Sequence, residues 1–307
     1  MPDSRVKIVI IGTINKDLIL PFQGASIQSF GGIYYTISTL SSIAGKDIAL
    51  LPVSFIGEEV YSHLLALLQG FPNIDKQGLF SLPGKHHEVI LEYVSPQTRT
   101  EKALFNFPSL EWKQLKKFKD ADFYIVNLIT GWDLSLNAFQ KLSKKYFDKL
   151  YLDIHFLVMG IDKLGNRFPK RPENIEKWIR GARFVQMNKT EFDIINEDDL
   201  HESEFYEKYL KPEQMLIITL AGEGVRIIFH KNSMIRNKHF PAYHLERIED
   251  VTGCGDVFGA GFVFQYLSTQ NLYSAVEFAN KVAAANCMLK GTNEFDQLYS
   301  RMEQIQK

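Results

Sequence analysis

Short apolar runs rich in β-branched residues recur along the chain, and each is bounded by polar residues or glycine. The first, VKIVIIG at Val6–Gly12, is too short for a stable helix and is typical of a strand buried on both faces. Five similar runs follow, at Phe123–Ile129, Lys149–Ile154, Ala182–Asn188, Met215–Leu220 and Val225–His230. The pattern therefore predicts a sheet that is covered on both sides.

Amphipathic segments with a period of about 3.6 residues lie between these runs. LSLNAFQKLSKKYF and RPENIEKWIRG are two examples, and Gly181 closes the second. Strands that alternate with helices predict an α/β fold with a doubly wound, mostly parallel sheet flanked by helices. No repeat, low-complexity tract or Pro/Gly-rich linker divides the chain, so we expect residues 1–307 to form a single domain.

Two stretches break this rhythm, 18–31 and 86–107. The first contains the polar segment QGASIQS, and the second alternates around a turn expected at Ser95–Thr98. We expect them to form a small separate β-sheet that acts as a lid. Because open strand edges expose unpaired backbone groups, a homodimer through the lid is a further expectation.

Composition narrows the range of partners and compartments. The chain carries 35 basic and 36 acidic residues, so no overall charge attracts it to nucleic acid or to an anionic membrane. Gly12, Lys16 and Asp17 interrupt the N-terminal apolar region, which argues against a signal peptide or a spanning helix. Cys254 and Cys287 form no metal-ligand pattern or disulfide framework, so we expect a reducing, cytoplasmic environment.

The stretch EDVTGCGDVFGAGF (249–262) places four glycines around one acid, Asp256. The residues after Asp256 are apolar all round, as in a buried helix, and Gly253–Gly255 is the loop that leads into it. The unpaired N–H groups and partial positive charge of a helix N-terminus suit a phosphate. Asp256 would either accept a proton from an attacking hydroxyl or simply cap the helix, and the stretch alone leaves both open.

The segment DVTGCGD resembles the Asp-x-Thr-Gly-x-Gly-Asp signature of the ribokinase-like (PfkB) family of carbohydrate and nucleoside kinases. Further stretches resemble family motifs in the same order along the chain: IGTINKD, FGG, VSFIGEEVYSHLL, NKTE, TLAGEGV and KGT. The resemblance implies the ribokinase-like fold and ATP-dependent phosphorylation of a hydroxyl group on a small sugar or sugar derivative.

The same resemblance implies the catalytic residues. Asp256 is the expected general base, and the amides of Gly253, Cys254, Gly255 and Asp256 are the expected anion hole for the γ-phosphate of ATP. Cys254 stands where the family usually has a small residue, but a backbone donor does not depend on its side chain.

Cation sites are implied in the same way. Asn188 and Glu191 of NKTE are expected to position Mg²⁺ through water, because Mg²⁺ keeps several waters when bound. Taken alone, NKTE favours the start of a helix after a strand rather than a metal site. Asp250 and Thr252 would contribute to the monovalent-cation site that some members of the family carry.

Asn15 and Asp17, expected at the end of the first strand, and the pair Gly31 and Gly32 resemble the family's contacts to sugar hydroxyls. A carboxylate accepts hydrogen bonds from adjacent hydroxyls, and glycine lets a substrate lie against the backbone.

TLAGEGV resembles the loop beside the adenine and ribose, which gives Thr219, Gly222 and Gly224 as expected nucleotide-binding residues. Ala221 departs from the glycine that is usual in the family at this position.

Two departures from the family pattern leave open which molecule accepts the phosphoryl group. Thr36 replaces the asparagine of the ribokinase-type Gly-Gly-x-x-x-Asn pattern, and DIHFL from Asp153 replaces Asp-x-Asn-x-Arg. A nucleoside kinase and a non-catalytic sensor of small molecules are therefore alternatives. The neighbouring Tyr34 and Tyr35 are expected to belong to the core rather than to stack on a substrate ring.

Other enzyme classes fit less well. The first strand ends in the single Gly12 rather than in GxGxxG, and no Gly-Lys pair is followed by Ser or Thr, as a P-loop requires. The eight histidines are scattered apart from His86 and His87, which we expect at the surface, so a metal hydrolase is not indicated.

Overall fold

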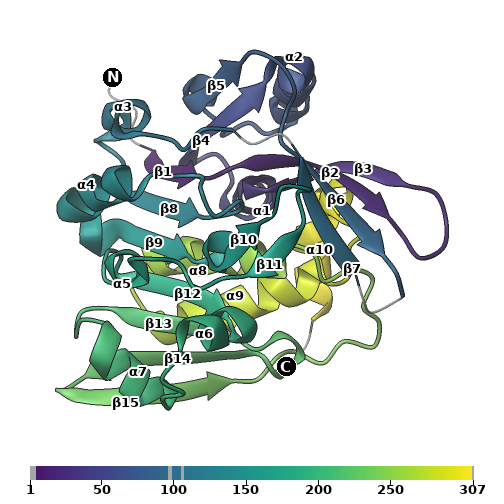
Figure 1. The fold of residues 1–307 in the computed structure, drawn as a ribbon. Coiled ribbons are helices and arrows are strands. Elements are labelled where there is room, and N and C mark those ends of the chain that lie inside the picture. Colours follow the sequence, from purple (N-terminus) through teal and green to yellow (C-terminus); the bar gives the residue numbers. More distant parts are fainter. Residues whose placement is uncertain (1–4, 96–98, 105–106, 306–307) are drawn as a thin grey trace.

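The computed structural model describes residues 5–95, 99–104 and 107–305. A nine-stranded sheet lies between two layers of helices, and a four-stranded sheet projects from one end of it (Figure 1). Along the large sheet the strand order is β15-β14-β13-β12-β9-β8-β1-β4-β5. This is the doubly wound α/β fold that the sequence predicts.

All six strands expected from the apolar runs belong to the large sheet. They are β1 (Val6–Ile11), β8 (Phe123–Asn127), β9 (Leu150–Asp153), β12 (Phe184–Asn188), β13 (Met215–Thr219) and β14 (Val225–Lys231). Three more strands complete it: β4 (Ile48–Gly57), β5 (Leu79–Leu82) and β15 (Met234–Phe240). The sheet is parallel from β5 to β13, whereas β14 and β15 pair antiparallel. Pro52 interrupts the apolar run of β4, which weakens its strand signal although the strand is buried throughout.

Alternate residues of the strands face two separate cores. Val9 and Ile11 of β1 point into one core, and Ile8 and Ile10 point into the other. The first core is covered by α3 (Trp112–Leu115), α4 (Leu136–Tyr146), α5 (Ile175–Ile179), α6 (Lys189–Ile195) and α7 (Glu202–Tyr209). The second is covered by α1 (Ile33–Ala44), α2 (Glu58–Leu67), α8 (Cys254–Thr269) and α9 (Leu272–Asn286), with α10 (Leu298–Gln304) packed beside them. In Figure 1, α8 and α9 lie behind the sheet and α4, α5 and α6 lie in front.

The small sheet contains the two stretches that interrupt the α/β rhythm. Its strand order is β3-β2-β6-β7, formed by β2 (Ile14–Leu20), β3 (Ile27–Gly32), β6 (Glu88–Tyr93) and β7 (Arg99–Leu104). We call these four strands the lid. A hairpin of β10 (Met159–Ile161) and β11 (Arg167–Pro169) reaches the lid, where the Ala103 N–H donates to the Gly165 carbonyl at 2.9 Å. Of the expected turn at Ser95–Thr98, residues 96–98 lie outside the described part of the chain.

The expectation that His86 and His87 lie at the surface is wrong. Their exposed fractions are 0% and 1%, because the chain that leads into β6 passes beneath aromatic side chains. His86 Nδ1 accepts the Gly57 N–H at 3.1 Å. Burial lowers the pKa of His86 to about 4, so His86 is neutral at pH 7 and serves the packing of the lid on β4.

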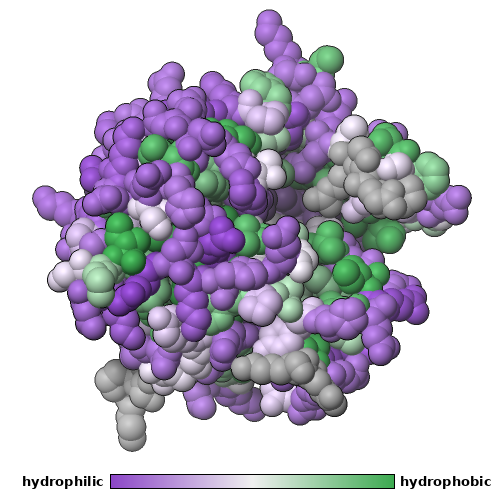
Figure 2. All heavy atoms as spheres, turned by 90° about the horizontal axis from the view of Figure 1, so that it is seen from below, coloured by the Kyte–Doolittle hydropathy of each residue, from purple (hydrophilic) through white to green (hydrophobic). Residues whose placement is uncertain are grey.

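The face seen in Figure 2 is covered largely by hydrophilic residues, with apolar residues gathered in smaller patches. Among the helices in the described part of the chain, none has the length and apolar character needed to cross a bilayer.

Candidate active site

A row of three polar side chains crosses the sheet where its central strands end. Asn127 of β8 pairs in register with Asp153 of β9, and Asp153 pairs with Gln186 of β12. Two residues earlier in these strands stand Ile125, Tyr151 and Phe184, all in the core under α8. Because side chains alternate along a strand, the polar row faces the same helix. Parallel strands thus bring three distant segments to one point beneath the start of α8.

Asp256 occupies the first turn of α8 and lies above this row. The helix begins after Gly253, whose φ of 75° is in the left-handed region, and the Val257 N–H donates to the Gly253 carbonyl at 2.9 Å. Asn127 Nδ2 donates to Asp256 Oδ1. Asp256 is only 7% exposed, and this burial raises its pKa to about 7. A carboxyl group with such a pKa can accept a proton near neutral pH.

Gln186 connects the polar row to the backbone of the signature. Its Nε2 donates to Asp153 Oδ2 at 2.6 Å and to the Gly255 carbonyl at 3.0 Å. Its Oε1 accepts the Tyr151 hydroxyl at 2.5 Å, which fixes the orientation of the amide. Gln186 therefore holds the first turn of α8 against the sheet.

Three buried carboxyl groups concentrate negative charge here. Burial raises the pKa of Asp153 well above its usual range, and the charges of Glu191 and Asp256 raise it further. Burial, together with the charge of Asp256, also raises the pKa of Glu191 to about 8. Such a group of carboxyls favours protons or a bound cation, either of which reduces the repulsion.

Asn188 and Glu191 form the start of α6 as a reciprocal capping box. The Glu191 N–H donates to Asn188 Oδ1 at 2.9 Å, and the Asn188 N–H donates to Glu191 Oε2 at 2.8 Å. The described residues include no group of three His, Cys, Asp or Glu side chains that could hold a metal by themselves. The donors that are present fit Mg²⁺ positioned through water and phosphate oxygens rather than a closed protein cage.

The expected acceptor residues lie in the lid, not at the end of the first strand. Asn15 and Asp17 belong to β2 and are 8% and 5% exposed, and Asn15 faces Gly31 across the β2–β3 pair. A Cβ added at Gly31 would lie 1.9 Å from Asp17 Oδ2, so Gly31 makes room for this carboxylate. Gly32 has a φ of 61°, and a Cβ there would lie 2.3 Å from the Thr13 carbonyl oxygen. Asn15 Oδ1 is a buried acceptor without a hydrogen-bond partner in the described structure.

Tyr35 of α1 packs against the signature. A Cβ at Gly253 would lie 2.3 Å from the Tyr35 ring, and Asp17 and Asp256 both lie near enough for their charges to act on its hydroxyl. Burial first, and these charges second, raise the pKa of Tyr35. Tyr34 and Tyr35 are 7% and 3% exposed, in agreement with the expected core role.

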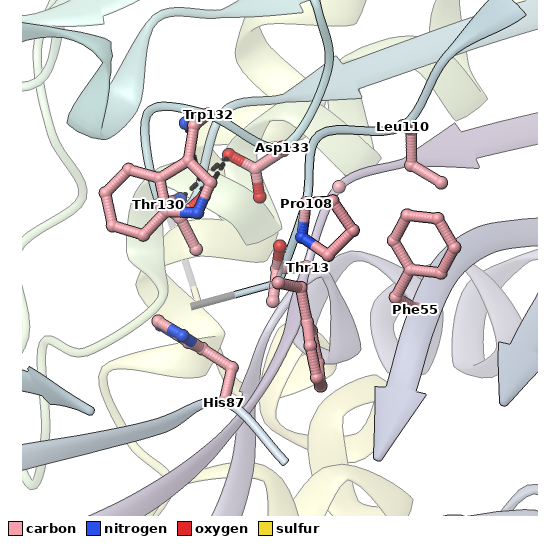
Figure 3. Close-up of a pocket in the computed structure, with 10 residues that line it drawn as sticks. Thr13, Phe55, His87, Pro108, Leu110, Thr130, Trp132 and Asp133 are labelled. Atoms are coloured by element: carbon pink, nitrogen blue, oxygen red, sulfur yellow. Dashed lines mark hydrogen bonds between the residues drawn. The ribbon is translucent and has the colours of Figure 1, made fainter. Parts of the chain in front are cut away.

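A small cavity of about 10 Å³ is lined by residues of the large sheet and of connections that adjoin the lid, among them Thr13 before β2 and His87 before β6 (Figure 3). Trp132 and His87 lie on one side of it, and Phe55 and Leu110 on the other. The Thr130 hydroxyl donates to Asp133 Oδ2 at 2.9 Å and so fixes the loop that carries Trp132. This volume holds about one water molecule, so an acceptor in this cavity would require the lid to open.

The expected nucleotide residues lie on the connection from β13 to β14. Thr219 ends β13 and pairs with Asn188 of β12, so the two motifs share one edge of the sheet. Ala221 has a φ of 49°, a conformation that favours glycine, which accounts for the glycine usual at this position. A Cβ at Gly224 would lie 2.1 Å from the Phe240 carbonyl oxygen, whereas Gly222 has open space around it.

A groove of about 960 Å³ lies next to this connection. It is lined by Phe240–Arg247, by Glu277 and Asn280 of α9, and by Met288, Gln304 and Ile305. The lining segment continues to Glu249, whose N–H donates to the Cys287 carbonyl at 2.8 Å, and then enters the signature. None of the three expected nucleotide residues lines the groove, but Gly224 packs on the segment that does.

The two cysteines, far apart in sequence, meet beside the signature. Cys254 Sγ and Cys287 Sγ are 3.2 Å apart. The chain between Glu249 and Cys254 is also held by its neighbours, since Asn286 Nδ2 donates to the Thr252 carbonyl at 3.0 Å and the Thr252 N–H donates to Asp250 Oδ1 at 2.8 Å. The Cys254 N–H donates to the Val251 carbonyl at 3.4 Å, so this member of the expected anion hole bonds within its own loop.

Asn127, Gln186 and Asp153 were not identified as site residues from the sequence. Each is a polar residue inside or at the end of an apolar run, and this is the signal that could have found them. Their common position depends on strand order and register, which one sequence does not reveal.

Comparison with known proteins gives a family match over part of the chain. Residues 161–297 match the sequence model of the pfkB family of carbohydrate kinases. The chain is 30% identical over 182 residues to the bifunctional protein HldE of a Nitratiruptor species, and this match covers 52% of the chain and 38% of HldE. The chain thus spans well under half the length of this relative.

Solved structures with the same fold cover nearly the whole chain. Ribokinase from Thermotoga maritima superposes with a TM-score of 0.75 at 18% identity, over 98% of this chain and 99% of that one. A nucleoside kinase from Burkholderia thailandensis in complex with inosine gives a TM-score of 0.76 at 17% identity, over 97% and 98%. The family model thus supports the resemblance to the ribokinase-like (PfkB) family over residues 161–297, and the solved structures show that nearly the whole chain has the ribokinase-like fold.

Proposed function

We propose that this protein is an ATP-dependent kinase that transfers the γ-phosphoryl group to a hydroxyl of a small sugar or sugar derivative. The observation that carries the proposal is Asp256, a buried carboxyl with a pKa of about 7 at the N-terminus of α8. Few arrangements place a base and a site for developing negative charge so close together.

In the proposed reaction, the acceptor hydroxyl gives its proton to Asp256 as its oxygen attacks the γ-phosphorus, and ADP leaves. Asn127 holds Oδ1 of the carboxylate, and Oδ2 would accept the proton. The amides of Gly255 and Asp256, at the positive end of α8, stabilise the charge on the transferred group. Most of the rate then comes from positioning and charge stabilisation, and the base supplies about 10²–10⁴-fold.

Asn15 and Asp17 would bind the acceptor hydroxyls. The unpartnered Asn15 Oδ1 supports this assignment, since a buried acceptor is stabilised when a ligand hydroxyl donates to it. The groove along Phe240–Arg247 has the size expected for the nucleoside part of ATP, and Thr219, Gly222 and Gly224 would border it.

Mg²⁺, positioned through water by Asn188 and Glu191, would neutralise charge on the phosphates. The buried carboxyls of Asp153, Glu191 and Asp256 support a cation here, because they lie close enough for their charges to interact and a cation would stabilise their charged forms. Asp250 and Thr252 are the residues that we propose for a monovalent cation.

The test is a phosphoryl-transfer screen with ATP and Mg²⁺ over sugars, sugar acids, polyols and nucleosides, with the phosphorylated product identified by mass spectrometry. We expect turnover on a sugar or sugar derivative, and its loss without Mg²⁺. Turnover on nucleosides alone would establish the nucleoside-kinase alternative. Binding of an acceptor without turnover under any condition would favour the sensor.

Asp256→Asn is the matched control, because it keeps the shape of the side chain and removes the base. We expect the variant to bind ATP as the wild type does and to lose turnover by a factor of about 10² or more. Unchanged turnover would refute the assigned role.

A further inference from the structure

The chain contains two cysteines, and the fold brings both to the first turn of α8. Helices α8 and α9 form an antiparallel hairpin whose connection is Gln270–Asn271. The start of α8 therefore lies beside the end of α9. Cys254 is the first residue of α8, and Cys287 follows the last residue of α9.

The two sulfur atoms are placed for bond formation. They are 3.2 Å apart, and a disulfide requires about 2.05 Å, so an approach of roughly 1 Å suffices. Both side chains are only partly buried, which leaves access for a small oxidant. Asn286 Nδ2 donates to Cys254 Sγ at 3.2 Å, which orients this sulfur toward the end of α9.

We propose that Cys254 and Cys287 are a site of reversible oxidation that forms an intramolecular disulfide. With hydrogen peroxide as oxidant, one sulfur attacks the peroxide as its thiolate, becomes a sulfenic acid, and releases one water. The second sulfur displaces the hydroxyl group of the sulfenic acid, the S–S bond forms, and a second water leaves. Two thiols lose two electrons and two protons, and one peroxide is reduced to two waters.

The disulfide also has a consequence that rests on the proposed kinase function. It would link the residue next to Gly255 and Asp256 to α9 and draw the first turn of α8 away from Asn127 and Gln186. Displacement of a catalytic group by about 1 Å lowers turnover by about 10²-fold, and we expect a loss of this size.

The experiment treats the reduced full-length protein with hydrogen peroxide and measures its intact mass and its titratable thiols. We expect the mass to fall by two hydrogens, the thiol count to fall from two to none, and a peptide containing both cysteines to appear in a non-reducing digest. Dithiothreitol should reverse all three changes. Two thiols that remain titratable, or oxygen adducts without a link, would overturn the proposal.

Cys287→Ala is the control variant, because its side chain lies outside the proposed catalytic groups. It should match the wild type in basal turnover and show no loss of two hydrogens with peroxide. Mass and thiol readouts need no turnover, so they decide the disulfide even if the reduced protein phosphorylates no acceptor. A reduced protein that phosphorylates no acceptor would count against the kinase proposal only.

Discussion

Asp256, the general base that we propose, lies in an environment that is unfavourable for charge. Its carboxyl is buried at the start of α8 and has one side-chain donor, Asn127, among the described residues. The helix N-terminus and Asn127 favour the carboxylate, whereas burial disfavours it. The effect of burial is the larger of the two, so the pKa of Asp256 rises to about 7.

The first prediction concerns activity and pH. If Asp256 is the base, kcat/KM should fall about tenfold per pH unit below about pH 7, because the protonated carboxyl cannot accept the acceptor proton. Higher Mg²⁺ concentrations should move this acidic limb to lower pH, since a nearby cation favours the carboxylate. Steady-state kinetics from pH 5 to 9 measure both effects, and a pH-independent rate across this range would contradict the prediction.

The second prediction concerns stability. The folded-state pKa of Asp256 is raised from 3.8 to about 7, so its contribution to stability is fully present below the unfolded-state value and is lost as pH rises through about 7. Asp256→Asn should therefore gain in free energy of unfolding relative to the wild type as pH rises from 5 to 8. We expect it to be more stable by about 1–3 kcal/mol at pH 8. Urea unfolding with a chelator and without nucleotide measures the difference, and a more stable wild type at pH 8 would contradict it.

The third prediction concerns Gln186 as a positioning residue. Gln186→Leu removes the donor to Asp153 and to the Gly255 carbonyl, so kcat should fall about tenfold while the KM for ATP changes little. Gln186→Glu should in addition shift the acidic limb of kcat/KM to higher pH, because it adds a fourth carboxyl. A purely structural role would lower stability in both variants without this difference between their pH profiles.

At the scale of elements, α8 uses its glycines in two ways. A Cβ at Gly259 would lie 3.2 Å from Tyr151, and one at Gly261 would lie 3.1 Å from Val282 of α9, so these two glycines allow close packing. Gly253 instead supplies the left-handed turn that starts the helix. Gly259 and Gly261 thus serve the packing of α8, and Gly253 sets the backbone conformation at its start.

The fourth prediction is that Gly253→Ala lowers stability by about 1–3 kcal/mol. Alanine is strained at a φ of 75°, and its Cβ would lie 2.3 Å from the Tyr35 ring. Turnover should fall as well, since the first turn of α8 must shift. Gly70→Ala is the matched control, because a Cβ at Gly70 meets nothing within 4 Å, and it should unfold like the wild type. Equal stability of the two variants in urea would contradict the prediction.

At the scale of the whole molecule, exposed apolar side chains lie on the lid strand β3 and in the connections next to β2 and β6. Phe22 is 52% exposed, Ile27 is 47% exposed and Val94 is 53% exposed. Ile27 belongs to β3, the strand at one edge of the lid. An apolar sheet edge of this kind is suited to pairing with a second copy of the chain.

The fifth prediction is a homodimer through the lid. Light scattering at micromolar concentration should give twice the mass of the chain, and Ile27→Asp should shift the protein toward the monomer. Tyr299→Ser, at a residue of α10 that is 57% exposed, is the control and should leave the mass unchanged. A wild-type mass equal to that of one chain would contradict the prediction.

Much of the architecture could be read from local patterns. Apolar runs predict six of the nine strands of the large sheet, and the glycine-rich stretch predicts the start of α8. These predictions are correct because the periods of strands and helices are local properties of the chain. The positions of Asn15 and Asp17 in β2, and the burial of His86 and His87, could not be read in this way, because they depend on how the lid packs on the large sheet.

The sequence by itself thus determined the class of fold, six of the nine strands of the large sheet and the place of Asp256 at a helix N-terminus. Only the tertiary structure decided that Asn127 and Gln186 lie beneath Asp256 and that Cys254 meets Cys287. The physical reason is that register between parallel strands and the length of a helical hairpin set contacts between residues far apart along the chain. Periodicity carries no information about such contacts.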